Sequence, residues 1–175
     1  MRRISQEGKT GLLQLLILLG GSFLYFYLSE RIRPHQNMAS FRMFLVFLLL
    51  YGGTIAFFFF YAQILGGRPR IKSLIATYTY SLLPTFYWFF GNAVLYILIP
   101  PPRTPSLPGM LLSIVFIAYS FSLFFWKFML LYLTLRFSTK LLFYRMMFVL
   151  LLYSTIMAGI SFILYKAQIF RVPFV

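Results

Sequence analysis

Residues 43–65 read MFLVFLLLYGGTIAFFFFYAQIL, a run of 23 residues without a charge, and this stretch decides the fold. At about 1.5 Å per residue, a helix of this length spans the hydrocarbon core of a bilayer, which is about 30 Å thick. The run is apolar on all faces, as expected for a helix surrounded by lipid or by other helices. It therefore predicts a membrane-spanning helix.

Four further apolar runs repeat this pattern along the chain. They cover residues 11–28, 74–99, 110–135 and 141–165, and short polar or proline-rich segments connect them. Because backbone groups in lipid must be paired within their own segment, we expect each run to be helical. The sequence thus predicts an all-α polytopic membrane protein, a single integral membrane domain over residues 1–175 with five transmembrane helices.

The composition agrees with this prediction and excludes most side-chain catalysis. The chain is 61% hydrophobic and 10% charged, whereas about a quarter of the residues of soluble proteins are charged. It has no Asp and no Cys, and its only carboxylates are Glu7 and Glu30. An acid/base pair is therefore not expected, and the lone His35 does not predict a metal site. We expect a non-enzymatic protein with no catalytic residues, cofactor or metal.

The basic residues predict an orientation. With five crossings, the segments on the N-terminal side hold nine Lys and Arg residues, and those on the other side hold six. Since short basic loops favour the cytoplasm, we expect a cytoplasmic N-terminus and an external C-terminus. The net charge of +14 is spread over both sides, which favours contacts with anionic lipid headgroups and not with nucleic acid.

Two residues inside the runs are candidates for function. Lys127 places an ammonium within the fourth run, and such a charge is a functional hypothesis by default. Its side chain either snorkels or forms a hydrogen bond between helices, or it has a role in transport or in binding a lipid headgroup. Pro84 should kink the third helix and free a backbone carbonyl, which serves packing in many helices and substrate binding in transporters.

Other candidates concern helix packing. Asn92 is suited to a hydrogen bond between helices. Gly66 and Gly67, directly after the second run, indicate a helix stop with a left-handed backbone. Small residues offer surfaces for close helix approach at three places: Gly20 with Gly21, Gly52 with Gly53 and Ala56, and Thr155 with Gly159.

The order of several motifs resembles the Yip1 domain family of five-span membrane proteins. The resemblance covers residues 44–165 and is carried by Gly66-Gly67, Ile71-Lys72-Ser73-Leu74, Tyr78-Thr79-Tyr80-Ser81-Leu82-Leu83-Pro84, and Trp126 ahead of a basic turn. It implies a cytoplasmic N-terminus and a five-helix bundle, and eukaryotic members act in vesicle trafficking with Rab GTPases. Residues 134–140 depart from the family, because they read TLRFSTK where a Gly-Leu turn is usual.

The chain is more similar to short prokaryotic members of that family. It lacks a long cytosolic N-terminal region, so we do not expect a GTPase partner, and the expected location is the bacterial inner membrane. Two functions follow. The first is a subunit or adaptor of a larger membrane complex that contacts lipids and other integral membrane proteins, or handles lipids. The alternative is a small transporter or lipid scramblase that uses the Pro84 break and Lys127.

Overall fold

The computed structural model describes residues 8–32, 40–98 and 107–166, and nearly all of these residues are helical. No strand occurs in the part of the chain that is described, which confirms the all-α prediction. His35 lies outside the described residues. The helices are α1 (Gly8–Ile32), α2 (Ser40–Ile64), α3 (Ile71–Ser81), α4 (Leu83–Leu98), α5 (Leu107–Thr139) and α6 (Phe143–Lys166).

Three of these helices contain segments long and apolar enough to cross a membrane. They are Phe41–Ile64 in α2, Leu107–Thr139 in α5 and Phe143–Leu164 in α6. The apolar segment of α1, Leu13–Leu28, is shorter, and the predicted third span is divided between α3 and α4. The fold therefore fits a multi-pass integral membrane protein.

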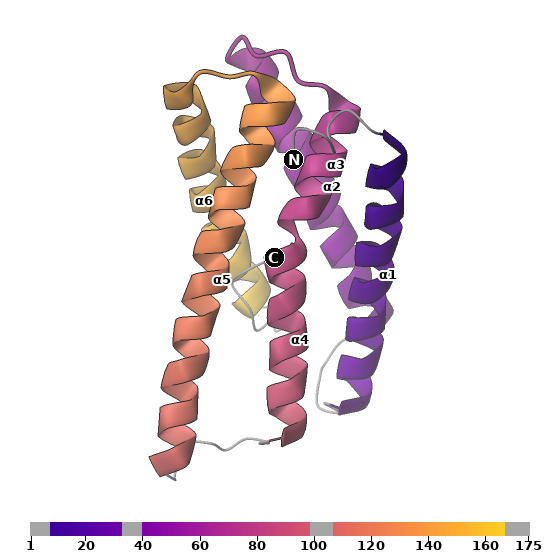
Figure 1. Ribbon diagram of the computed structural model, residues 1–175, viewed down its shortest axis with the longest axis vertical. Coiled ribbons are helices and arrows are strands. Elements are labelled where there is room, and N and C mark those ends of the chain that lie inside the picture. The colour runs from indigo at the N-terminus through magenta and orange to yellow at the C-terminus, as the bar shows by residue number, and fades with distance from the viewer. Residues whose placement is uncertain (1–7, 33–39, 99–106, 167–175) are drawn as a thin grey trace.

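Consecutive segments run in opposite directions along the long axis of the molecule (Figure 1). The chain descends through α1 and ascends through α2, and α3 and α4 then descend one after the other. Helix α5 returns over the whole length of α3 and α4, and α6 turns back beside it. As a result, the α2–α3 turn and the α5–α6 turn lie at the same end of the molecule.

Leu82 separates α3 from α4. Its backbone has φ −80° and ψ −11°, and its N–H donates to the carbonyl of Thr79 at 3.1 Å. Pro84 follows two residues later and has no N–H for the carbonyl four residues before it. The observed interruption thus lies beside Pro84, and the prediction that the proline itself bends a transmembrane helix stays a prediction.

Aromatic rings join α1 to α2 and α4. Tyr25 stacks on Phe89 with ring centroids 4.3 Å apart, and Phe26 packs against Phe47 at 6.0 Å. Gly21 makes the close approach of α1 and α4 possible, because an added Cβ would lie 2.5 Å from the ring of Phe86. Of the small surfaces predicted from the sequence, Gly21 is thus used inside the chain.

Candidate functional site

Gly66 and Gly67 end α2 in a hydrogen-bonded cap. Gly66 has φ +77°, its N–H donates to the carbonyl of Gln63 at 3.0 Å, and the N–H of Gly67 donates to that of Ala62 at 2.8 Å. This pair of bonds is the Schellman arrangement, which places a glycine in the left-handed conformation just past the helix end. The predicted helix stop with a left-handed backbone is confirmed.

The α2–α3 turn is bound directly to the end of α5. The N–H of Arg68 donates to the carbonyl of Thr139 at 2.9 Å, and the N–H of Arg70 donates to that of Ser138 at 3.1 Å. The guanidinium of Arg145, from the first turn of α6, donates to the carbonyl of Leu65. Since the last carbonyls of a helix lack partners within that helix, each turn satisfies the helix end of the other.

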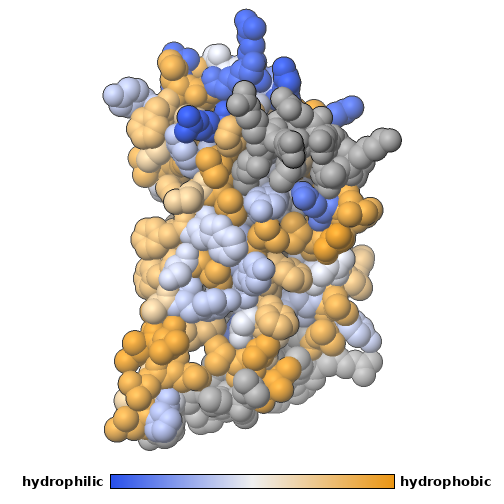
Figure 2. Space-filling model, viewed as in Figure 1, coloured by the Kyte–Doolittle hydropathy of each residue, from blue (hydrophilic) through white to orange (hydrophobic). Residues whose placement is uncertain are grey.

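Basic side chains surround these two joined turns. Figure 2 shows hydrophilic residues gathered at this end and mostly apolar residues over the rest of the visible face. We call the six exposed cations around the turns the basic end. They are Arg68, Arg70, Lys72, Arg136, Lys140 and Arg145.

Hydroxyl groups below the basic end hold the helices to one another. Thr134 of α5 donates to the carbonyl of Thr77 of α3 at 3.0 Å, and both residues are fully buried. Tyr51 of α2 and Thr79 of α3 share a hydrogen bond of 2.6 Å. Because their polar groups are occupied by these bonds, this cluster acts in packing.

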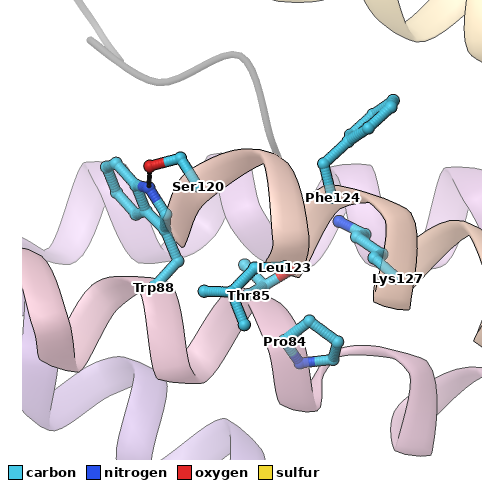
Figure 3. A pocket seen from close by; sticks show the side chains of 7 residues that line it. All are labelled: Pro84, Thr85, Trp88, Ser120, Leu123, Phe124 and Lys127. Carbon is cyan, nitrogen blue, oxygen red and sulfur yellow. Dashed lines mark hydrogen bonds between the residues drawn. The ribbon is translucent and has the colours of Figure 1, made fainter. Parts of the chain in front are cut away.

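A second feature is a hollow between α4 and α5, which we call the α4–α5 hollow (Figure 3). It is small: the space open to the centre of a water-sized sphere is about 10 Å³, roughly what one bound water needs. Its lining combines apolar walls with four polar side chains. The lining residues are Pro84, Thr85, Trp88, Ser120, Leu123, Phe124 and Lys127.

Lys127 directs its ammonium into this region and away from the basic end. The side chain is 7% exposed, and its neighbours in the hollow from α5 all precede it in sequence. Figure 3 shows the amine pointing along α5 towards Phe124. Side chains on a helix lean towards its N-terminus, so this direction is the one that helix geometry favours. Lys127 lies twelve residues before Thr139, about 18 Å along the axis, so the arrangement does not correspond to snorkelling at the basic end.

Thr85 places a hydroxyl in the same hollow. The residue is 4% exposed, and its Oγ1 has no hydrogen-bond partner. Four other buried threonines, Thr54, Thr77, Thr79 and Thr139, each bond to the carbonyl four residues earlier, as Thr79 does to Ile75 at 2.7 Å. For Thr85 that carbonyl belongs to Ser81, the last residue of α3, on the other side of the interruption at Leu82.

The other two polar groups of the hollow bind each other. Trp88 donates its indole N–H to the hydroxyl of Ser120 at 3.1 Å, and Ser120 donates to the carbonyl of Phe116 at 2.8 Å. This chain of bonds fixes the indole ring at one wall of the hollow. The Thr85 hydroxyl is therefore the polar group of the lining that has no hydrogen-bond partner.

The structure brings Pro84 and Lys127 together and separates the other candidates. Trp126 is exposed on α5 and stacks on Tyr87 of α4 at 5.8 Å. Asn92 is half-buried on α4 and does not line the hollow, and its predicted bond between helices stays a prediction. Gly66 and Gly67 belong to the basic end.

Thr85 and Ser120 were not predicted as site residues. One signal for Ser120 is its spacing, since Ser120, Leu123, Phe124 and Lys127 recur at the three- and four-residue intervals of one helix face. The role of Thr85 depends on where α3 ends and on which residues of α4 oppose Lys127. Neither is encoded in a local pattern.

Comparison of the chain with protein-family models, characterised proteins and solved structures finds no match. The resemblance to the Yip1 domain family therefore stays a prediction.

Proposed function

We propose that the chain is a non-enzymatic, five-span membrane protein that works as a subunit or adaptor of a larger membrane complex. Three spans would correspond to α2, α5 and α6, the fourth to α1, and the fifth to α3 and α4 together. Small residues that face outward from the fold support this role. An added Cβ at Gly52 or Gly53 of α2 would meet nothing within 4 Å.

Gly159 of α6 also faces outward: an added Cβ there would meet nothing within 4 Å, and its neighbour Ala158 is exposed too. Helix association in lipid depends on close backbone approach and van der Waals packing, because apolar burial gives no advantage between lipid and protein. Glycines that are not used within the chain are suited to contact a helix of another protein. The contrast with Gly21, which is in use, is the observation that carries the proposal.

The basic end supports the orientation. Its six exposed cations would face the cytoplasm and contact anionic headgroups, at about 1 kcal/mol per residue near the surface. In this arrangement α1 begins on the cytoplasmic side, and α6 runs towards the opposite side. The proposed location is the bacterial inner membrane.

Purification tests the subunit role. The tagged full chain, extracted in a gentle detergent from the membranes of its source, should retain one or more integral membrane proteins at a fixed ratio. Gly53→Leu and Gly159→Leu should each reduce that retention, since the new side chains extend into the proposed contact. The melting temperature of the purified chain should hardly change, because an added Cβ at either position meets nothing within 4 Å.

Phe125→Leu is the matched control for retention, as it alters an exposed apolar residue of α5 without removing a glycine. It should leave the ratio unchanged. Elution of the chain alone, or equal retention by all three variants, would contradict the subunit role.

A small transporter or lipid scramblase is the second candidate, and the shared position of Pro84 and Lys127 in the α4–α5 hollow favours it. An interrupted helix beside a cation resembles the broken helices around which transporters bind substrates. Vesicles containing the purified chain should then exchange a labelled anionic lipid between leaflets. Lys127→Leu should abolish the exchange; exchange at the rate of empty vesicles would contradict this function.

A further inference from the structure

The α4–α5 hollow contains two polar groups whose placement packing alone does not explain. The Thr85 hydroxyl is buried without a hydrogen-bond partner, which is unfavourable in folded proteins. The Lys127 ammonium is buried near the middle of α5, where a charge is costly. Both line one small space, so a single bound group can contact both.

We propose that the α4–α5 hollow binds a phosphate group through the ammonium of Lys127 and the hydroxyl of Thr85. The phosphate belongs either to an anionic lipid headgroup or to a free phosphate ion. This inference deepens the second candidate function by naming the ligand class. Binding is measured apart from transport, so the failure of one does not decide the other.

The chemistry of the lining selects an anion. An ammonium has three N–H donors and no acceptor, and a hydroxyl donates one hydrogen, so oxygens with negative charge can accept hydrogen bonds from both groups. Hydrogen bonds to charged groups are about twice as strong as neutral ones, and apolar walls such as Leu123 strengthen the attraction by excluding water. A cation would instead be repelled by Lys127.

The size of the hollow limits what enters it. The hollow has room for about one water-sized group, so one oxygen of a phosphate enters it, while the rest of the headgroup and any acyl chain stay outside. Phe124 is the most exposed lining residue, at 38%, which puts the mouth beside its ring. An acyl chain attached to the phosphate would then lie along the exposed apolar surface of α5, next to residues such as Phe121 and Phe125.

Trp88 provides a reporter at the site, because its indole lines the hollow. The chain has two tryptophans, and Trp126→Phe leaves Trp88 as the only one. The purified full-length variant, in a neutral detergent, is titrated with dihexanoyl phosphatidic acid in one arm and with inorganic phosphate in the other. We expect a saturable change in Trp88 emission. A change in both arms indicates a general phosphate site, and a change with the lipid alone indicates a headgroup site.

Two substitutions in this background assign the binding to its residues. Lys127→Met keeps the length of the side chain and should raise the dissociation constant about tenfold or more. Thr85→Val keeps the shape and should raise it severalfold without lowering the melting temperature, because no hydrogen bond is lost. Lys72→Met, at the exposed basic end, is the control and should bind as the parent does.

The absence of saturable change in both arms would overturn the proposal. It would also fail if Thr85→Val and the parent bound equally, since the orphan hydroxyl is the group that distinguishes this site from a general cationic surface. Equal loss on Lys72→Met would assign the signal to the basic end instead. If Lys127→Met does not fold, the comparison of Thr85→Val with Lys72→Met still decides between these outcomes.

Discussion

The two halves of α5 lie in different surroundings. From residue 123 to residue 139 the helix contains all of its buried residues except Gly109, and it packs against α3 and α6. From residue 107 to residue 122 it lies beside α4, and most of its large apolar side chains are exposed (Figure 1). Residues 123–139 are joined to the basic end by hydrogen bonds, whereas residues 107–122 present an apolar surface.

This difference indicates where the specificity of the fold resides. In lipid, apolar side chains gain little by turning inward, so hydrogen bonds and close contacts must fix the arrangement of the helices. In the described residues such bonds join the two turns and link Thr134 and Tyr51 to α3, and the bonds from Trp88 to Ser120 and from Tyr119 to the Tyr87 carbonyl join α4 to the other half of α5. Thr85 and Lys127 lie near the boundary between the two halves of α5, where the proposed phosphate would bind.

The largest loss of stability should come from Gly67→Ala, because Gly67 makes the closest contact in the α2–α3 turn that is bound to the end of α5. The new Cβ would lie 2.8 Å from the carbonyl oxygen of Ala62 and 3.0 Å from that of Thr139, and neither backbone atom can move freely. We expect a loss of about 1–3 kcal/mol in the free energy of unfolding. Denaturant titration of the purified protein in detergent measures it.

Gly20→Ala is the control for Gly67→Ala, because nothing lies within 4 Å of an added Cβ at that position. It should not destabilise the fold. Equal stability of the two variants would show that the α2–α3 turn is not held against α5 as the hydrogen bonds indicate.

Thr134→Val should have a smaller effect on the same half. It preserves the shape of a fully buried side chain and removes the bond to the Thr77 carbonyl. We expect a loss of about 1 kcal/mol, and a zero or slightly favourable change for Thr85→Val, which removes no bond. Unfolding both variants side by side checks this. Equal losses in the free energy of unfolding would mean that the hydrogen-bonded hydroxyl of Thr134 contributes no more than the unpaired hydroxyl of Thr85.

Tyr51→Phe removes the hydroxyl that joins α2 to Thr79 of α3. Thr79 keeps its bond to the Ile75 carbonyl, so less is left unsatisfied than in Thr134→Val. Bonds between membrane helices average about 0.6 kcal/mol, and we expect a loss of that size. A double-mutant cycle with Thr79→Val measures the coupling; a coupling of zero would mean that the bond does not contribute to stability.

The sequence predicts most of the helical framework because lipid imposes a simple rule. Long runs without charge mark the helices, and Gly66 with Gly67 marks a helix end, since few other residues adopt a left-handed cap. What it does not predict is the length of each helix beyond its apolar run. Helix α5 reaches Thr139, past the predicted end at residue 135, because its last carbonyls are capped by residues distant in sequence.

The candidate site is only half predictable for a related reason. Lys127 and Pro84 stand out because each breaks a local rule, a charge in an apolar run and a proline in a helix. Their meeting depends on how α4 packs against α5, and so does the isolation of Thr85. A single chain's sequence carries no local signal for contacts that join positions about 40 residues apart.

Gly53→Ala should have the smallest effect on stability and tests the open surface of α2. Nothing lies within 4 Å of the added methyl group, and alanine is favoured over glycine inside a helix, so stability should rise by about 0.5 kcal/mol. If the glycine is instead kept for contact with a partner helix, the same substitution should weaken retention of that partner in gentle detergent. Higher stability with weaker association would separate these two roles of one glycine. Higher stability with unchanged association would mean that this face of α2 contacts lipid alone.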